Sequence, residues 1–265
     1  MLIIGEKINS SHPKISRAIA GQDAAYLQKL AQEQVAGGAQ MLDVNCGTVK
    51  NEPAAMDWLV KIIQEKVQVP LVIDSPNPEA IEAGLSRLSA GHQEQAMVNS
   101  ITAEKERFEK ILPLVKKYNA GVIALTMNEQ GIPRTALERF TIAQNLQQIT
   151  GDYKIPLSNL YIDPLVQPVA SEPQQVIEFL ESLRLIKTLP KAQTICGLSN
   201  VSFGLPNRSL LNAIFIAMCF GYGLDAAIID PTDKNIMGAV RAAEALLNKD
   251  EYCLNYIKAY RESQL

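Results

Sequence analysis

Polar residues of a restricted kind follow several short apolar segments of the chain. Residues 194–208 read T-I-C-G-L-S-N-V-S-F-G-L-P-N-R, so an apolar run leads into Ser199 and Asn200, and Arg208 follows one loop later. This segment contains no histidine, no pair of cysteines at metal-ligand spacing and no obvious nucleophile. Its chemistry must therefore depend on the polar residues at the same height on neighbouring strands.

Every one of the apolar segments ends in a carboxylate or an amide. The residues at these ends are Glu6, Asn9, Asp43, Asn45, Asp74, Asn99, Asn128, Asp163, Asn200 and Asp230. One such residue alone is typical of a helix cap or an Asx-turn, and we expect Ser75 and Ser100 to be caps. A polar residue at every end instead predicts a shared rim, where carboxylates repel unless a ligand or hydrogen bonds compensate them.

The composition of this rim restricts the ligand. Cations are scarce, with Arg208 as the plausible exception and Lys7 near the first strand. A phosphate-based substrate would need more arginine, lysine or backbone nests. A carboxylate can accept two parallel N–H bonds from an aminopyrimidinone edge, as it does from a guanidinium. The rim therefore predicts a planar, nitrogen-rich heterocycle as the ligand.

The elements that must position these residues alternate along the chain. Strands are expected at residues 2–8, 41–45, 70–75, 96–100, 121–127, 160–165, 193–200 and 224–230. Helices are expected at residues 24–36, 54–67, 79–88, 103–118, 135–149, 173–186, 209–220 and 235–247. Residues 252–260 predict a short additional helix at the C-terminal end.

This alternation predicts an α/β fold in one domain over residues 1–265, a closed (β/α)8 TIM barrel. An open doubly wound sheet is the alternative, but it normally has fewer strands and a glycine-rich first turn, unlike Gly5-Glu6-Lys7. In a barrel the chemistry lies at the C-terminal ends of the strands, where the polar residues are. The longer loops at 128–133 and 167–172 are candidate lids.

Bulk composition excludes several functions. The net charge of −3, without a basic run, argues against nucleic acid and anionic membranes as partners. Residues 1–9 lack the long apolar region of a signal peptide. The longest apolar stretch, 210–229, is interrupted by polar residues and glycines, which predicts a buried helix followed by a buried strand and not a membrane span.

The cysteines and histidines predict neither a disulfide framework nor a metal site. The four cysteines are Cys46, Cys196, Cys219 and Cys253, and none forms a C-x-x-C pair. We expect a reducing cytoplasm, with Cys46 and Cys196 in the core. His12 and His92 are expected to be satisfied or exposed surface residues.

Seven motifs in order along the chain resemble a known family. They are L-I-I-G-E-K-I-N, L-D-V-N, V-I-D-S, M-V-N-S, L-T-M-N-E-Q-G-I-P, L-Y-I-D-P-L and G-L-S-N-V-S-F-G-L-P-N-R. Together they resemble the pterin-binding methyltransferases, most closely the methyltetrahydrofolate:corrinoid protein methyltransferases of anaerobic one-carbon metabolism. They are also similar to the folate domain of cobalamin-dependent methionine synthase.

The resemblance implies an activity and its partners. The expected reaction is methyl transfer between N5 of tetrahydrofolate and the cobalt of a separate corrinoid protein. It would serve the acetyl-CoA pathway or an O- or N-demethylation system. The resemblance also implies a homodimer, with the apolar late helices as a plausible contact. Direction is left open, because the reaction is nearly symmetric at this site.

Site residues follow from the matching motifs. The resemblance implies that Asp74, Asn99 and Asp163 hold the pterin ring. Asn200 would lie near N5, Gly197 and Ser199 would shape that edge, and Arg208 would lie near the folate tail. Glu6 and Asp43 match further rim positions. We expect Asn200 and Asp74, with water, to stabilise a protonated N5 whose proton comes from solvent.

One position departs from the family. Phe203 stands where a relative has a glutamine, and a phenyl ring cannot make the hydrogen bond attributed to that glutamine. The motif S-F-G-L-P instead resembles the corresponding segment of methionine synthase. Neither S-S-H-P at His12 nor A-G-H-Q at His92 matches the corrin-binding motif D-x-H-x-x-G, so the corrinoid must come on a partner, with no intrinsic metal. The alternatives are a dihydropteroate synthase-like pterin enzyme and a non-catalytic corrinoid-binding protein.

Overall fold

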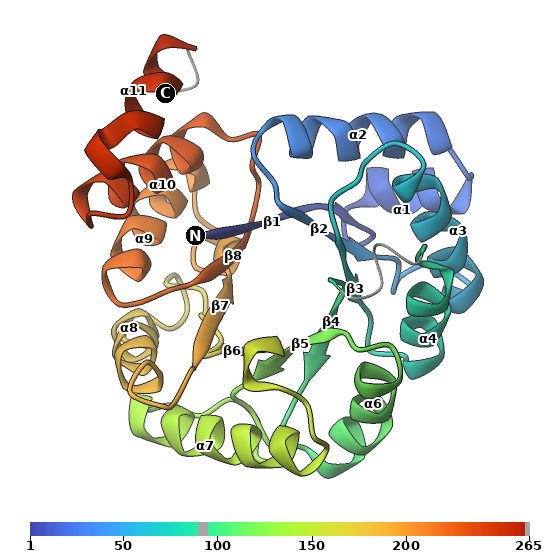
Figure 1. The fold of residues 1–265 in the computed structure, drawn as a ribbon, viewed down its shortest axis with the longest axis horizontal. Coiled ribbons are helices and arrows are strands. Elements are labelled where there is room, and N and C mark those ends of the chain that lie inside the picture. The colour runs from blue at the N-terminus through green and yellow to red at the C-terminus, as the bar shows by residue number, and fades with distance from the viewer. Residues whose placement is uncertain (90–94, 263–265) are drawn as a thin grey trace.

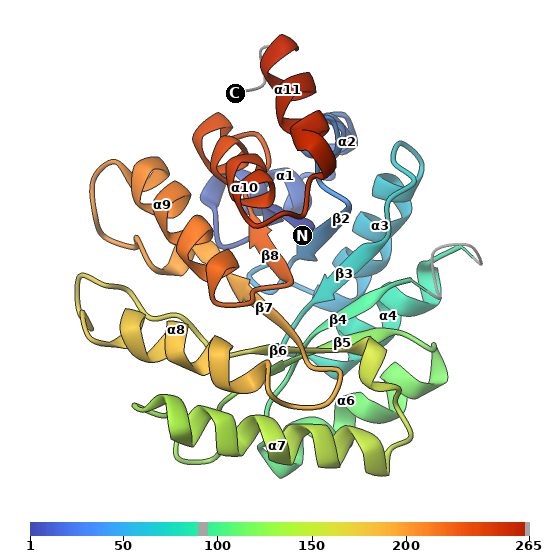
Figure 2. The same ribbon diagram turned by 60° about the vertical axis from the view of Figure 1, so that its left-hand side comes forward.

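The computed structural model describes residues 1–89 and 95–262, which form a closed barrel of parallel strands inside a ring of helices (Figure 1). The eight strands follow one another in chain order around the barrel, and β1 (Leu2–Asn9) pairs with β8 (Ala226–Ile229) to close it. The predicted TIM barrel is therefore confirmed. Figure 2 shows the same ring from another side, with α11 (Leu254–Arg261) projecting beyond α10 (Lys234–Leu246) at the C-terminal end.

The strands carry the polar rim at their ends. They are β1 (Leu2–Asn9), β2 (Met41–Asn45), β3 (Leu71–Asp74), β4 (Met97–Ile101), β5 (Gly121–Leu125), β6 (Leu160–Asp163), β7 (Gln193–Gly197) and β8 (Ala226–Ile229). The expected strands at 121–127, 160–165, 193–200 and 224–230 were too long. Local bonds replace the strand pairing there: Leu165 N donates to Asp163 Oδ1 at 2.7 Å, and Val201 N donates to Leu198 O at 3.2 Å.

The helices cover the outside of the barrel. They are α1 (Pro13–Ala20), α2 (Ala24–Ala36), α3 (Glu52–Gln64), α4 (Pro78–Arg87), α6 (Lys105–Lys117), α7 (Ala136–Asp152), α8 (Gln175–Ile186), α9 (Arg208–Gly221), α10 (Lys234–Leu246) and α11 (Leu254–Arg261). Three short 3-10 helices are η1 (Leu157–Asn159), η2 (Leu198–Asn200) and η3 (Glu251–Cys253). Helix α11 is confirmed, and residues 210–229 form a helix followed by a buried strand. The helix is buried on one face only, because Leu210, Ile214 and Met218 on its other face are exposed.

Helix α1 was not expected from the sequence. It has eight residues, begins with Pro13 and buries Ile15 and Ile19 at an i, i+4 spacing. Proline in the first turn is a favourable start, because its missing N–H would have no partner there.

Side-chain caps explain where several helices begin. Thr135 and Glu138 form a capping box at the start of α7, and Asp233 accepts from the first turn of α10. The expectation that Ser75 and Ser100 cap helices was wrong. Asn77 caps α4 and Glu104 precedes α6, because each loop continues two to four residues past the serine before its helix starts.

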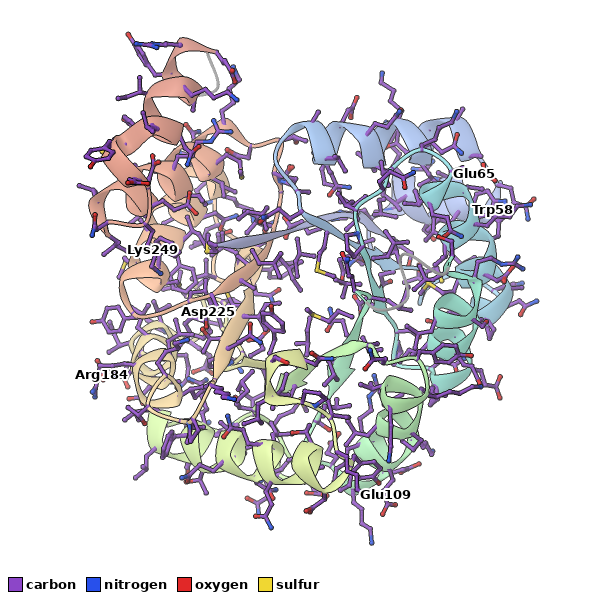
Figure 3. All side chains as sticks on the ribbon, in the orientation of Figure 1. Trp58, Glu65, Glu109, Arg184, Asp225 and Lys249 are labelled. Carbon is purple, nitrogen blue, oxygen red and sulfur yellow. The ribbon has the colours of Figure 1, made fainter. Side chains whose placement is uncertain are left out.

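Apolar side chains fill the lower barrel and form a floor under the polar rim. This floor consists of Ile4, Met41, Val72, Met97, Ile123, Ile195 and Ala226. Figure 3 shows that side chains occupy the space that the ribbon leaves open, while Glu109 and Arg184 point outward from the helices. A ligand can therefore enter only from the C-terminal ends of the strands.

Two β-bulges modify the rim. Between Gly5 and Ile8, β1 contains one residue more than the paired segment of β2. Between Asn99 and Ile101, β4 likewise contains one residue more than the paired segment of β5. The first bulge leaves the N–H of Lys7 unpaired in the sheet, and buried Gln34 accepts it through Oε1 at 2.9 Å. Bulges at barrel rims re-aim side chains, here those of Glu6 and Lys7.

Cysteine placement agrees with the expected core. All four cysteines are free thiols, and Cys46, Cys196 and Cys219 are buried while Cys253 is exposed.

No helix among residues 1–89 and 95–262 combines the length and apolarity needed to cross a membrane.

Candidate functional site

The strands open at their C-terminal ends into a cavity of about 530 Å³. It is lined by Glu6, Asn9, Ser11, His12, Asp43, Asp74, Asn99, Gly197, Ser199, Asn200, Phe203, Arg208, Ser209, Asn212, Ile228, Asp230, Asp233 and Ile236. All the expected site residues except Asp163 are in this lining. Residues from opposite ends of the chain thus meet at one surface.

Asp43, Asp74 and Asn99, which we call the strand wall, form the side of the cavity at β2, β3 and β4. Asn99 Nδ2 donates to Asp43 Oδ1 at 3.2 Å, and Asn45 Nδ2 donates to Asp74 Oδ2 at 2.9 Å. The carboxyl groups of Asp43 and Asp74 are hydrogen-bonded to each other. Each member of the strand wall is therefore held by a side chain of another strand.

Burial raises the pKa values of both carboxyl groups in the strand wall. For Asp74 the pKa rises to about 6, because the hydrogen bond from Asn45 and the charge of Arg107 partly offset the loss of water. For Asp43, which is 2% exposed, burial and the charge of Asp74 raise the pKa well above its usual range. The strand wall therefore favours a ligand that brings N–H donors to these acidic groups.

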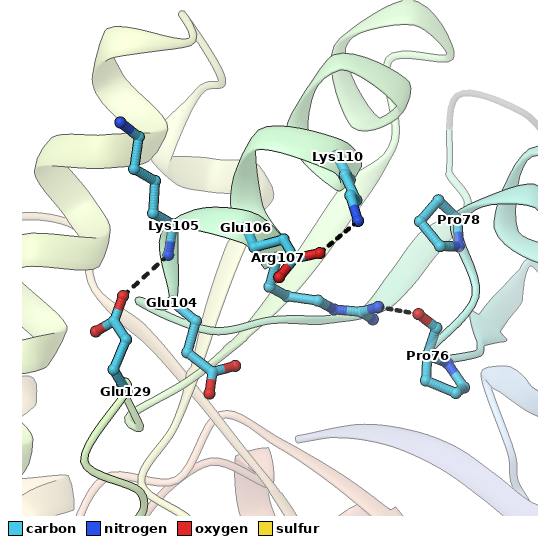
Figure 4. Close-up of a pocket in the computed structure, with 8 residues that line it drawn as sticks. All are labelled: Pro76, Pro78, Glu104, Lys105, Glu106, Arg107, Lys110 and Glu129. Atoms are coloured by element: carbon cyan, nitrogen blue, oxygen red, sulfur yellow. Dashed lines mark hydrogen bonds and ion pairs between the residues drawn. The ribbon is translucent and has the colours of Figure 1, made fainter.

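Arg107 braces the loops behind the strand wall. Its Nε donates to Ser100 O at 2.9 Å, its Nη2 donates to Ser75 O at 2.9 Å, and its Nη1 donates to Pro76 O. Figure 4 shows Arg107 reaching Pro76 across a second hollow of about 400 Å³, where Lys110 pairs with Glu106. The guanidinium thus ties the ends of β3 and β4 together and places a positive charge near Asp74.

Ser199, Asn200 and Arg208, which we call the loop wall, form the opposite side. Arg208 Nη2 donates to Ser199 O at 2.6 Å and its Nε donates to Ser202 Oγ at 3.0 Å, which holds the loop after β7 in a turn. Asn200 and Arg208 are exposed, and Phe203 at the mouth is 66% exposed. The prediction that strand seven runs to Asn200 was wrong, since Ser199 and Asn200 lie on η2.

Glu6 joins the two walls. It lies in the β1 bulge, and Ser199 Oγ donates to its Oε1 at 2.7 Å. Burial raises the pKa of Glu6 to about 7, and the charge of Asp230 adds to the rise. Lys7 offers little compensation, because its Nζ is paired with Asp230 Oδ2 at 2.9 Å.

Asp163 lies beside the cavity and not in its lining. Its Oδ1 accepts from Leu165 N at 2.7 Å, and its carboxyl group also accepts from the backbone of Gly197, which does line the cavity. Burial raises the pKa of Asp163 to about 7, against the opposing charge of Arg139. Its role in holding a pterin stays a prediction.

Several lining residues were missed in the sequence. Ser11, Ser209, Asn212 and Asp233 come from the loop after β1, the first two turns of α9 and the N-cap of α10, whereas Asn9 at the end of β1 was expected at the rim. Asn212 is 5% exposed, and its Oδ1 has no hydrogen-bond partner within the described ranges, so it remains available to a ligand. An asparagine inside an apolar helix was a signal for this position.

The two histidines have different outcomes. His12 is exposed, as expected of a surface residue, but it precedes α1 and lines the cavity mouth. His92 lies outside the described residues. In the part of the chain that the structure describes, no group of three or more histidine, cysteine, aspartate or glutamate side chains is arranged to hold a metal ion.

Comparison with known families decides the relationship. A model of the pterin-binding enzymes matches residues 5–230. The chain belongs to the pterin-binding enzyme family. This agrees with the family that the seven motifs resemble.

Two relatives show which members of the family this pterin-binding enzyme is similar to. It is 33% identical over 269 residues to a methylcorrinoid:tetrahydrofolate methyltransferase of Eubacterium limosum, covering 100% of this chain and 98% of that protein. It is 34% identical over 244 residues to methionine synthase of Mycobacterium tuberculosis, covering 86% of this chain but 20% of that protein.

Solved structures agree on the fold. The pterin-binding enzyme matches dihydropteroate synthase from Stenotrophomonas maltophilia with a TM-score of 0.67 at 17% identity, over 92% of both chains. It matches dihydropteroate synthase from Xanthomonas albilineans with a TM-score of 0.65 at 17% identity, over 93% of this chain and 92% of that one. At this identity the likeness concerns the barrel alone.

Proposed function

We propose that this protein transfers a methyl group between N5 of tetrahydrofolate and the cobalt of a corrinoid carried by a separate protein. One observation carries the proposal: the motifs shared with the pterin-binding methyltransferases converge on a single acidic and amide-lined cavity. Similarity to a methylcorrinoid:tetrahydrofolate methyltransferase along the whole chain supports it.

The strand wall suits the pterin. Asp74 and Asn99 offer a carboxylate and an amide side by side, because they are paired residues of β3 and β4. These groups match the alternating N–H donors and acceptors of a pterin ring. Asp163 completes this site in our proposal, since its carboxyl group lies against Gly197 at the cavity edge. Folate's tail would leave past Arg208 and Phe203 at the mouth.

The loop wall suits the reacting nitrogen. In the direction from folate, the N5–CH3 bond breaks and N5 must carry a proton, because an amine anion is a poor leaving group. Asn200 donates a hydrogen bond or accepts one from N5–H, and Asp74 stabilises the positive charge of the protonated amine. The proton comes from solvent, which reaches the exposed Asn200. The reverse direction returns that proton to solvent.

A corrinoid fits as a visiting group. When docked by its own protein, it supplies the cobalt centre that accepts or gives up the methyl group. The exposed Phe203 and Asn200 lie where such a partner would meet the folate. Reaction in this form also suits a reducing cytoplasm, where we place the protein because its four cysteines are free thiols.

The charge of the cavity disfavours a dihydropteroate synthase reaction. Among the described residues that line it, Arg208 is the only side chain with a permanent positive charge, against the acidic Glu6, Asp43, Asp74, Asp230 and Asp233. Departure of a pyrophosphate would need cations to neutralise it. A non-catalytic corrinoid-binding role would not explain the buried carboxyl and amide groups of the strand wall.

The test mixes purified protein with methyltetrahydrofolate and free cob(I)alamin and follows absorbance. We expect loss of Co(I) and formation of methylcobalamin, together with the reverse reaction from methylcobalamin and tetrahydrofolate. A parallel assay offers a pterin pyrophosphate and p-aminobenzoate. Dihydropteroate formation, or folate binding without any methyl transfer, would overturn the proposal.

We also propose a homodimer. Leu210, Ile214, Met218 and Tyr222 form an exposed apolar row on α9, with exposed fractions of 51%, 54%, 41% and 38%. Their i, i+4 spacing places them on one helix face, and such a row favours a protein interface. Light scattering should give the mass of a dimer, and Ile214→Glu should give a monomer.

A further inference from the structure

We propose that Asp43 and Asp74 share a single proton, held on Asp43, so that Asp43 is a positioning residue that keeps Asp74 an oriented, singly charged acceptor. This inference rests on the proposed function, in which Asp74 faces the pterin. It concerns the carboxyl pair itself and adds a residue that acts through Asp74.

The geometry of the pair requires a proton. The side chains come from neighbouring strands β2 and β3 and are hydrogen-bonded to each other. A hydrogen bond between two carboxyl groups needs one of them to be protonated, because two carboxylates have only acceptors. Asp43 is only 2% exposed, so a second negative charge on the pair would be poorly solvated.

The surroundings decide which residue holds the proton. The charged groups that act on Asp43 are Asp74 and Glu6, both acidic, and Asn99 donates to its Oδ1. Asp74 instead receives a hydrogen bond from Asn45 and lies near the positive Arg107, although Glu52 opposes this. The negative charge is therefore more stable on Asp74, and the proton more stable on Asp43.

Two consequences follow for the ligand. The pair carries one negative charge and not two, which limits the repulsion inside the cavity. Asp74 is fixed by donors from Asn45 and Asp43 and also lines the cavity. The burial that raises the pKa of Asp43 supports the same assignment.

Infrared difference spectroscopy tests the proton directly and needs no folate. The spectrum of the native protein minus that of Asp43→Asn at neutral pH should contain the carbonyl stretch of a protonated carboxyl group. If the difference contains carboxylate bands instead, Asp43 is ionised and the inference is wrong. Thermal unfolding followed by circular dichroism checks that the variant folds.

Tetrahydrofolate titration calorimetry tests the positioning role. The side-chain amide of the Asp43→Asn variant can keep both hydrogen bonds of the protonated aspartate, one donated to Asp74 and one accepted from Asn99. Asp43→Asn should therefore bind at least about tenfold more tightly than Asp43→Ala, the loss expected for one hydrogen bond to a charged group. Equal affinities of the two variants would contradict the role.

The pH dependence provides a readout that simple packing would not change. Native affinity should fall toward alkaline pH as Asp43 loses its proton, whereas the affinity of Asp43→Asn should fall less, since an amide does not ionise. Glu6 and Asp163 titrate in both proteins, so the difference reports the Asp43–Asp74 pair, whose shared proton the variant lacks. The same pH dependence of affinity in the native protein and in Asp43→Asn would contradict the inference. Absence of folate binding in the native protein would instead defeat the proposed function, with the infrared result unaffected.

Discussion

The two walls of the cavity are built differently although both present polar groups to one ligand. Asp43, Asp74 and Asn99 lie on strands and are linked to each other and to Asn45. Ser199 and Asn200 lie on a 3-10 turn whose backbone is held by Arg208. The difference indicates a division of labour: the strand wall fixes the ligand's orientation, and the loop wall meets solvent and partner where the reaction occurs.

The difference also has an electrostatic side. The strand wall and Glu6 hold buried carboxyl groups whose pKa values lie above their ordinary range, and the loop wall holds neutral amides and hydroxyls beside an exposed guanidinium. Buried acids destabilise the folded state when they ionise. The buried acids of the strand wall therefore lower the free energy of unfolding relative to apolar residues at the same positions, and they provide binding specificity.

The largest expected effect comes from removing the central acceptor of the strand wall. Asp74→Ala should weaken tetrahydrofolate binding about 100-fold, because a charged hydrogen bond is lost and the ligand's donors stay unpaired. Calorimetry measures the affinity. Asp57→Ala, which removes an exposed carboxylate paired with Arg87, is the matched control. A loss of threefold or less for Asp74→Ala would mean that the strand wall does not orient the pterin.

Removing the amide of the loop wall should have a smaller effect on folate affinity and should act on the rate instead. Asn200→Ala should lower the methyl transfer rate about 100-fold while folate affinity falls only about threefold, because its hydrogen bond strengthens as charge develops at N5. Single-turnover absorbance and calorimetry separate the two quantities. The control is Asn207→Gly, an exposed amide in the same loop whose φ of 48° suits glycine. Equal losses of rate and affinity would make Asn200 a binding residue only.

Glu6 should link the site to protein stability. Its pKa of about 7 in the folded protein exceeds the ordinary 4.5, so the folded state holds its proton more tightly than the unfolded state. That stabilisation is complete below about pH 4.5 and is lost as the pH rises through about 7. Glu6→Gln should therefore gain roughly 2 kcal/mol in free energy of unfolding relative to the native protein between pH 5 and pH 8.

Urea unfolding at the two pH values measures this gain. Asp74 and Asp163 also have raised pKa values, but their contributions cancel in the comparison because both proteins contain them. Glu106→Gln serves as the control, since that carboxylate is on the surface beside Lys110. The same pH dependence in Glu6→Gln and the native protein would show that Glu6 is not the buried acid responsible.

The barrel was predictable because its signal repeats. Each buried strand is a compact apolar run and each helix has its own spacing, so small errors at the ends do not change the topology. Helix α1 was missed because its eight residues carry only two buried positions, Ile15 and Ile19. The late strand ends were misplaced because side chains such as Asp163 take over the backbone N–H groups there.

The site was predictable where a residue ends a strand and less so elsewhere. Asp43, Asp74 and Asn99 follow from strand ends that meet at one edge of a barrel. Asn212 lies in the second turn of α9 and Asp233 is the N-cap of α10, and their approach to the cavity depends on how the two helices pack. The β1 bulge that turns Glu6 toward Ser199 depends on strand register, which no local pattern in the sequence reports.

The smallest effect should come from the mouth of the loop wall. Phe203 is 66% exposed, so Phe203→Gln should change the free energy of unfolding by less than about 0.5 kcal/mol. Because Phe203 lies exposed at the cavity mouth, the substitution should lower methyl transfer with a corrinoid protein about threefold, a loss of under about 1 kcal/mol, and transfer with free cob(I)alamin by less. Stopped-flow absorbance with the two acceptors measures the contrast. An equal loss with both acceptors would instead assign Phe203 to the folate, because folate takes part in both reactions.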